Sequence, residues 1–166
     1  MTAGTGVPTM RTWLITALQD VTGTGEALDG VRVQYSPPTN LDQVLADNGN
    51  VEVIYWAETR ATVNLRGMKG TANVKYREEA TFTLVVLVAA DTVDQTLEDV
   101  EARAADLLGQ VVLVFQGTAM PALGVHNIAC WIEGWETNPG RLSIGGVPVH
   151  AMAYDVDVHS EVNVEL

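Results

Sequence analysis

Ala80–Phe115 reads ATFTLVVLVAADTVDQTLEDVEARAADLLGQVVLVF, a pattern typical of a buried strand followed directly by a long amphipathic helix. Its first part, Thr81–Ala90, alternates polar and apolar residues and then becomes the continuous apolar run Val85–Val88. Runs of this kind, rich in β-branched residues, are typical of strands that are covered on both faces. We therefore predict a central strand at Thr81–Ala90, with the rest of a sheet built around it.

A long helix is predicted directly after this strand. Thr92 stands three residues before Gln95, which is the spacing of a capping box, so we expect the helix to run from Thr92 to Phe115. Its apolar residues recur every three or four positions and form one stripe: Val93, Leu97, Val100, Ala104, Leu107, Leu108, Val111 and Phe115. Its outer face is mostly acidic: Asp94, Glu98, Asp99, Glu101 and Asp106, with Arg103 among them. The helix should lie across the sheet, with Leu108 buried and close to Leu87 of the strand.

The composition is that of one folded domain with a strongly acidic charge balance. The chain has 166 residues, of which 47% are hydrophobic and 18% are charged, and its net charge is −12. The shortage of basic residues argues against binding to nucleic acid phosphates. It does not exclude DNA passing nearby, because an acidic protein surface repels DNA and lets it slide. Because charged residues fall below the usual fraction of about 25%, either part of the surface faces other protein or the domain is simply compact and rich in Val and Ala.

The N-terminal stretch, the length of the apolar runs and the cysteine content indicate in which cellular compartment the protein folds. The opening MTAGTGVPTM lacks the basic and apolar segments of a signal peptide, and no apolar run reaches the roughly 20 residues that cross a bilayer. Cys130 is the single cysteine, so an internal disulfide is excluded. We therefore expect a protein that is made and folds in a cytoplasm, without contact to a membrane.

The remaining sequence predicts one more helix and four more strands. The helix is expected at Met10–Val21, with Thr9 as its N-cap, because apolar residues recur there at helical spacing. The strands are expected at Val31–Tyr35, Val51–Trp56, Ile128–Glu136 and Val147–Val158, with a helical turn at residues 41–45, a turn at 138–140 and a second, flexible point at 145–146. This order indicates an α+β fold: a mostly antiparallel sheet packed by an N-terminal helix and a long central helix.

Thr59–Arg77 differs from the rest of the chain in charge. It contains five of the nine basic residues and no acidic residue, and it alternates polar and apolar residues on both sides of Gly67–Gly70. This predicts a protruding hairpin arm. A basic arm on an acidic protein suggests contact with an acidic neighbour, and the alternative is a solvated loop. The candidate contact residues are Arg60, Arg66, Met68, Lys69, Lys75 and Arg77.

One group of side chains could carry chemistry. In a strand, Asp155, Asp157, His159 and Glu161 would all point to one side, where carboxylates and an imidazole could hold a divalent cation. The alternative, which we favour, is the solvated face of a strand whose valines point to the core. The sequence contains none of the phosphate-binding, zinc-protease, nucleophile-elbow or CxxC motifs, and Cys130 fits buried packing. We therefore assign no catalytic, cofactor or metal residue.

The order of these elements resembles that of the tail-terminator proteins of long-tailed bacteriophages. The resemblance is carried by RTWLITAL (residues 11–18), EEATFTLVVLVAADTVDQTLEDVEARAADLLG (78–109) and CWIEGWETNPGRLSIGGVPVHAMAYDVDV (130–158), and it extends from about Arg11 to Val158. It implies one domain over residues 1–166, with a mostly antiparallel sheet, flanking helices and the basic arm. It also implies a homohexameric ring that caps the tail tube and joins it to the head, without catalytic residues or cofactors.

On this resemblance we expect a structural virion protein of the head–tail junction, and not an enzyme. Its partners would be further copies of itself, the tail-tube protein and a head-completion or stopper protein, while DNA passes through the ring without specific binding. A different head–tail connector or a tail-tube protein is an alternative. From another class, the alternative is a small cytoplasmic metal-binding domain or enzyme that uses Asp155, Asp157 and His159.

Overall fold

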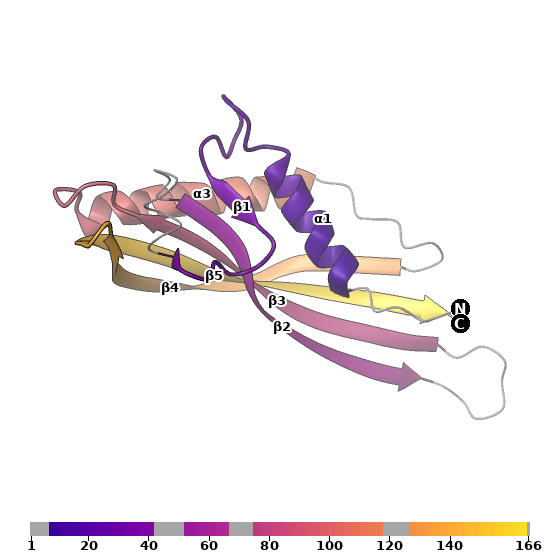
Figure 1. The fold of residues 1–166 in the computed structure, drawn as a ribbon. Helices are drawn as coiled ribbons and strands as arrows, with labels where there is room; N and C mark the ends of the chain where they lie inside the picture. Colours follow the sequence, from indigo (N-terminus) through magenta and orange to yellow (C-terminus); the bar gives the residue numbers. More distant parts are fainter. Residues whose placement is uncertain (1–6, 42–51, 67–74, 118–126, 166) are drawn as a thin grey trace.

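The computed structural model describes residues 7–41, 52–66, 75–117 and 127–165, and it confirms the predicted α+β class. In these residues, a five-stranded sheet with the order β1-β2-β3-β5-β4 carries the helices α1 and α3 (Figure 1). Only β1 runs parallel to its neighbour. The elements are α1 (Val7–Gln19), β1 (Arg32–Gln34), β2 (Glu52–Arg66), β3 (Lys75–Ala89), α3 (Leu97–Gly117), β4 (Asn127–Ile144) and β5 (Val147–Glu165).

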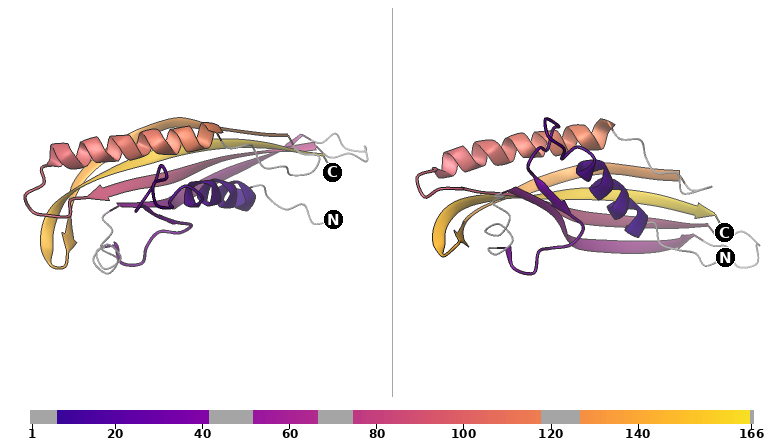
Figure 2. Two further views of the ribbon diagram at one scale, coloured as in Figure 1. Left: turned by 90° about the horizontal axis from the view of Figure 1, so that it is seen from above. Right: turned by 45° about the horizontal axis from the view of Figure 1, so that its top comes forward.

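The hairpin predicted between Thr59 and Arg77 is confirmed in its described part, and it is a direct continuation of the sheet. β2 and β3 are single long strands that pair from Glu52↔Val88 to Arg66↔Lys75. β5 follows β3 along the same length, as far as Lys75↔Glu165. The arm therefore projects beyond α1 as part of the sheet (Figures 1 and 2).

The prediction of a chain reversal at Asn138–Gly140 is wrong. These three residues lie inside β4, and Pro139 pairs with Met152 of β5. A proline lacks the N–H that a central strand needs, but β4 is an edge strand, where that donor is not required. The reversal is at Gly145-Gly146, whose φ values of 58° and 84° suit glycine and a tight hairpin.

The long helix begins one turn later than predicted. Thr96 is the N-cap: its Oγ1 accepts from the Asp99 N–H at 3.2 Å, and the Thr96 N–H donates to Asp99 Oδ2 at 3.0 Å. Gln95 instead accepts from the Asp91 N–H at 2.9 Å and so braces the preceding turn. Val93 consequently lies outside the helix and is 61% exposed, although the predicted apolar stripe included it.

The N-terminal helix begins earlier than predicted and ends earlier. α1 starts at Val7 and already contains Thr9, so Thr9 is not the N-cap. Pro8 fits the first helical turn, where a backbone N–H has no partner within the helix. Met10, Leu14 and Leu18 are buried, as the apolar spacing predicted.

Both helices cover the same face of the sheet, which we call the helix face. Strand register places Trp56, Leu84 and Val156 side by side in one row across this face. Trp56 Nε1 donates to the carbonyl oxygen of Arg11 in α1 at 3.1 Å. Glu52 lies on the same side of β2 and is held by two hydrogen bonds from Arg103 of α3, at 2.6 and 2.9 Å. The two helices also touch each other: the rings of Trp13 and Phe115 lie 5.8 Å apart.

Leu87 and Leu108 are both buried, as predicted, but they belong to different layers. Val86 and Val88 share the rows of the helix face, so Leu87 between them points to the opposite face. Leu108 is on the buried side of α3. The expectation that the two leucines are close is therefore not supported by the register.

Two β-bulges lie in the same row of the sheet. Register shifts occur in β2 between Trp56 and Glu58 and in β4 between Ile132 and Gly134. The paired row is Glu58, Thr83, Asp157 and Gly134. Because bulges bend a strand and increase its twist, we call this row the crease. It separates the half of the sheet that holds β1 from the half that continues into the arm, which we call the arm half.

Candidate functional site

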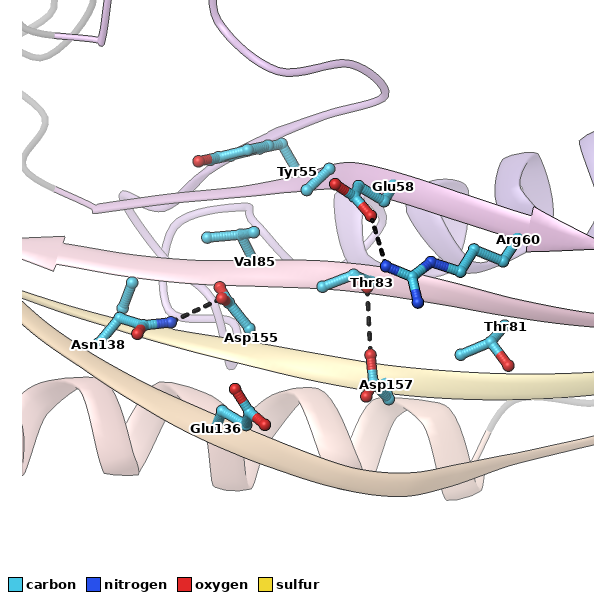
Figure 3. A pocket seen from close by; sticks show the side chains of 12 residues that line it. Tyr55, Glu58, Arg60, Thr81, Thr83, Val85, Glu136, Asn138, Asp155 and Asp157 are labelled. Atoms are coloured by element: carbon cyan, nitrogen blue, oxygen red, sulfur yellow. Dashed lines mark hydrogen bonds and ion pairs between the residues drawn. The ribbon is translucent and has the colours of Figure 1, made fainter.

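The face opposite the helices, the open face, carries a shallow hollow of about 680 Å³. Figure 3 shows its side chains in front of the strands, with the helix ribbons behind them. No described helix covers the hollow. The residues that line it come from all four long strands: Tyr55, Ala57, Glu58, Arg60, Thr81, Thr83, Val85, Glu136, Asn138, Ala153, Asp155 and Asp157. Four of these residues are acidic and one is basic, so the hollow is negatively charged.

The predicted row of carboxylates on β5 lies on this open face. Asp155 Oδ2 accepts from Asn138 Nδ2 at 2.6 Å, and Asp157 Oδ1 accepts from Thr83 Oγ1 at 3.1 Å. Burial raises the pKa of Asp155, and the nearby charges of Glu136 and Asp157 raise it further. Burial, and then Asp155, likewise raise the pKa of Tyr55. The hollow thus concentrates negative charge in a partly desolvated place.

His159 and Glu161 continue the same row but interact with the arm. Arg77 forms ion pairs with Glu161 and, at 2.9 Å, with Glu79. The His159 ring packs 4.6 Å from the ring of Trp131, and its Nε2 lies 3.8 Å from Glu161. Within the described residues, no group of three or more His, Cys, Asp or Glu side chains is arranged to hold a metal ion. The four predicted residues share a face, as expected, and their described contacts are with side chains of the sheet: hydrogen bonds, ion pairs and the ring contact of His159.

The candidate contact residues of the arm have different surroundings. Arg60 is exposed, and its nearest carboxylate is Glu58, at 3.5 Å. Arg77 is half-buried in the ion pairs given above. Arg66 and Lys75 pair at the described end of the hairpin, whereas Met68 and Lys69 lie outside the described residues. Arg60 is therefore the described basic side chain of the arm that is best placed to meet another molecule.

An apolar seam on the other face was not anticipated from the sequence. Two shallow hollows of about 610 and 660 Å³ lie between α3 and β4, and both are lined by Val112 and Trp135. Trp135 is 55% exposed and Leu113 is 60% exposed. The periodicity placed Trp135 in a strand, but only the sheet order shows that this strand is an edge. Exposed aromatic residues at an edge are typical of protein contacts.

Cys130 lines the same seam, where it is partly buried. Burial raises the pKa of its thiol to about 12, so the reactive thiolate is scarce at neutral pH. His150 lies on β5, where its carbonyl oxygen accepts from the Ala90 N–H at 2.8 Å, and His126 lies outside the described residues. The arrangement of the described side chains fits surface contact and charge better than acid–base or nucleophilic catalysis.

Comparison with known protein families finds no family model that matches this sequence, and no match is found among curated proteins. In the described parts of the chain, no helix is both long and apolar enough to cross a membrane.

Proposed function

We propose that this protein is a structural component of a phage virion: a ring-forming tail terminator that ends growth of the tail tube and joins the tail to the head. The proposal rests on the resemblance in the order of elements, together with an α+β fold of the expected class. Ending a polymer requires two unlike binding surfaces and no chemical step. A protein of this kind needs no catalytic residue.

The observation that carries the proposal is the acidic hollow on the open face of the sheet. Both helices pack on one side, and the other side presents Glu58, Glu136, Asp155 and Asp157 around a shallow hollow. Antiparallel sheets commonly leave one face to solvent. An acidic face repels DNA phosphates and so lets DNA pass without being retained. A ring of such subunits with the open face inward would form a channel of this kind.

The first test is deletion of the protein from its phage. We expect heads and tail tubes that are complete but unjoined, with tubes of variable length, because both the stop and the joint are lost. Electron micrographs of the lysate measure both quantities. Tails of normal length that are already attached to heads would refute the proposal.

A second test addresses which face is inward. The double variant Asp155→Lys and Asp157→Lys changes the open face, and Glu98→Lys with Glu101→Lys changes the exposed side of α3 by the same charge. If DNA passes over the open face, the first variant should still join heads to tails but should slow DNA release from triggered particles. The matched α3 variant should release DNA at the wild-type rate. Equal release by both variants would contradict an inward open face.

A further inference from the structure

Among the residues that the structure describes, the two outer edges of the sheet have no strand beside them in the arm half. β1 pairs with β2 only at residues 53–55, so the outer edge of β2 has no described strand beside it from Trp56 to Arg66. On the opposite edge, Pro139 and the residues after it lie on the β1 side of the crease, where a proline blunts strand pairing. From Asn127 to Gly134 the outer edge of β4 contains no proline or lysine.

The strand register places these two edges in the same rows of the sheet, so they lie at the same position along the strand direction. Glu58 and Gly134 share the crease row, and Asn64 and Asn127 share the row that passes through Arg77 and Asn163. The free segments Glu58–Asn64 and Asn127–Gly134 thus start and finish in the same rows. Each segment is long enough to form a strand of ordinary length.

The directions of the strands also fit. β3 is antiparallel to β2, β5 to β3, and β4 to β5, so β4 points opposite to β2. A copy that is rotated about an axis along the strands would bring its β2 beside β4 in the antiparallel sense. Such a head-to-tail contact closes into a ring when the rotation closes, and it leaves no unpaired edge in the arm half.

The side chains at the two edges are complementary. Arg60 shares a row with Trp131 through Thr81 and His159. Arg60 has an 86% exposed side chain, and Trp131 is 39% exposed on the open face. An arginine that meets a tryptophan ring forms a favourable cation–π contact. The exposed carboxylate of Glu133, which lies on β4 within the same rows, adds attraction for the same arginine.

We infer that the free edge of β4 in one copy pairs with the free edge of β2 in the next copy, over the rows Glu58–Asn64 and Asn127–Gly134, so that the sheets of neighbouring copies are continuous. The inference rests on the proposed ring and specifies the contact that builds it. Trp135 and the seam beside α3 flank this contact on the helix face.

Engineered disulfides test the register directly. Thr62 and Ala129 occupy one row, through Glu79 and Glu161, and are therefore expected to face each other across the contact. In a Cys130→Ser background, Thr62→Cys protein is mixed with Ala129→Cys protein and oxidised. A disulfide-linked dimer is expected. The matched control is Thr62→Cys mixed with Asn138→Cys, a residue of β4 on the other side of the crease, which should give no dimer.

Two results would overturn the inference: absence of the Thr62–Ala129 dimer, or equal yield from the Asn138 control. A second measurement does not depend on disulfide geometry. Arg60→Glu should lower the fraction of assembled rings in native mass spectrometry, whereas Arg141→Glu, an exposed β4 position beyond Pro139, should leave it unchanged. Equal assembly of the Arg60→Glu protein and the wild type would count against the contact.

Failure of this contact and failure of the proposed function give different results. Rings that cap tail tubes without the Thr62–Ala129 disulfide would retain the terminator proposal and refute the edge pairing. Rings that form the disulfide but do not bind the ends of purified tubes would retain the edge pairing and refute the terminator. Both measurements use the full chain.

Discussion

Trp56 joins α1 to the sheet, so its replacement by phenylalanine should destabilise the protein in a predictable way. The side chain is fully buried, its Nε1 donates to the Arg11 carbonyl oxygen at 3.1 Å, and its ring lies 5.6 Å from that of Phe82. Trp56→Phe removes the hydrogen bond, which is worth about 0.5–1.5 kcal/mol. The space left by the smaller ring costs about 1–2 kcal/mol more. We expect the free energy of unfolding to fall by about 1.5–3.5 kcal/mol.

The assay is urea unfolding followed by circular dichroism, at a concentration where sedimentation shows a monomer. Trp131→Phe is the matched control: this tryptophan is 39% exposed on the edge strand, so its replacement should cost about 0.5 kcal/mol or less. Hydrogen exchange provides a second readout, because the amides of α1 should exchange faster in Trp56→Phe only. Equal unfolding midpoints for the two variants would refute the assignment of Trp56 as the link between α1 and the sheet.

Three further predictions follow from particular contacts. Thr96→Ala should lower the free energy of unfolding by about 1 kcal/mol because it removes the N-cap of α3, whereas Thr92→Ala should have almost no effect; urea unfolding compares them. Cys130 should react with iodoacetamide at pH 8 far more slowly in the folded protein than in urea, since its thiol has a pKa of about 12; equal rates would contradict its burial. Because the pKa of Asp155 is raised in the folded state, stability should fall as pH rises between the ordinary Asp pKa and the raised value. Asp155→Asn should reduce that slope, and an unchanged slope would show that other groups cause it.

The elements that could be predicted from the sequence are those fixed by local periodicity. Alternation and the apolar run at Val85–Val88 were enough to place β3, and helical spacing was enough to place α1 and α3. The hairpin arm was also predictable, because its pattern continues on both sides of a glycine pair. These signals depend only on neighbours in the chain.

The errors concern features that depend on the rest of the fold. The motif Asn138-Pro139-Gly140 is typical of a turn, and it can be a strand here only because β4 lies at the edge of the sheet. The helix start was misplaced because Gln95 bonds to Asp91 and Thr96 takes the capping role. The predicted acidic row on β5 was correct as a shared face. Its contacts with Asn138 and Thr83 could not be predicted, because they depend on which strands are neighbours.

The crease has a mechanical consequence. The two outer strands of the row, at Glu58 and Gly134, have interrupted ladders, while β3 and β5 cross it with an unbroken register between them. The sheet should therefore bend most easily along this row, because its two outer strands are interrupted there. The two inner strands, β3 and β5, resist bending because their pairing is continuous. A load applied to the arm half would be carried by β3 and β5 and would tilt the arm half as one body. Such a load would change the angle between the two halves of the sheet without unfolding any strand.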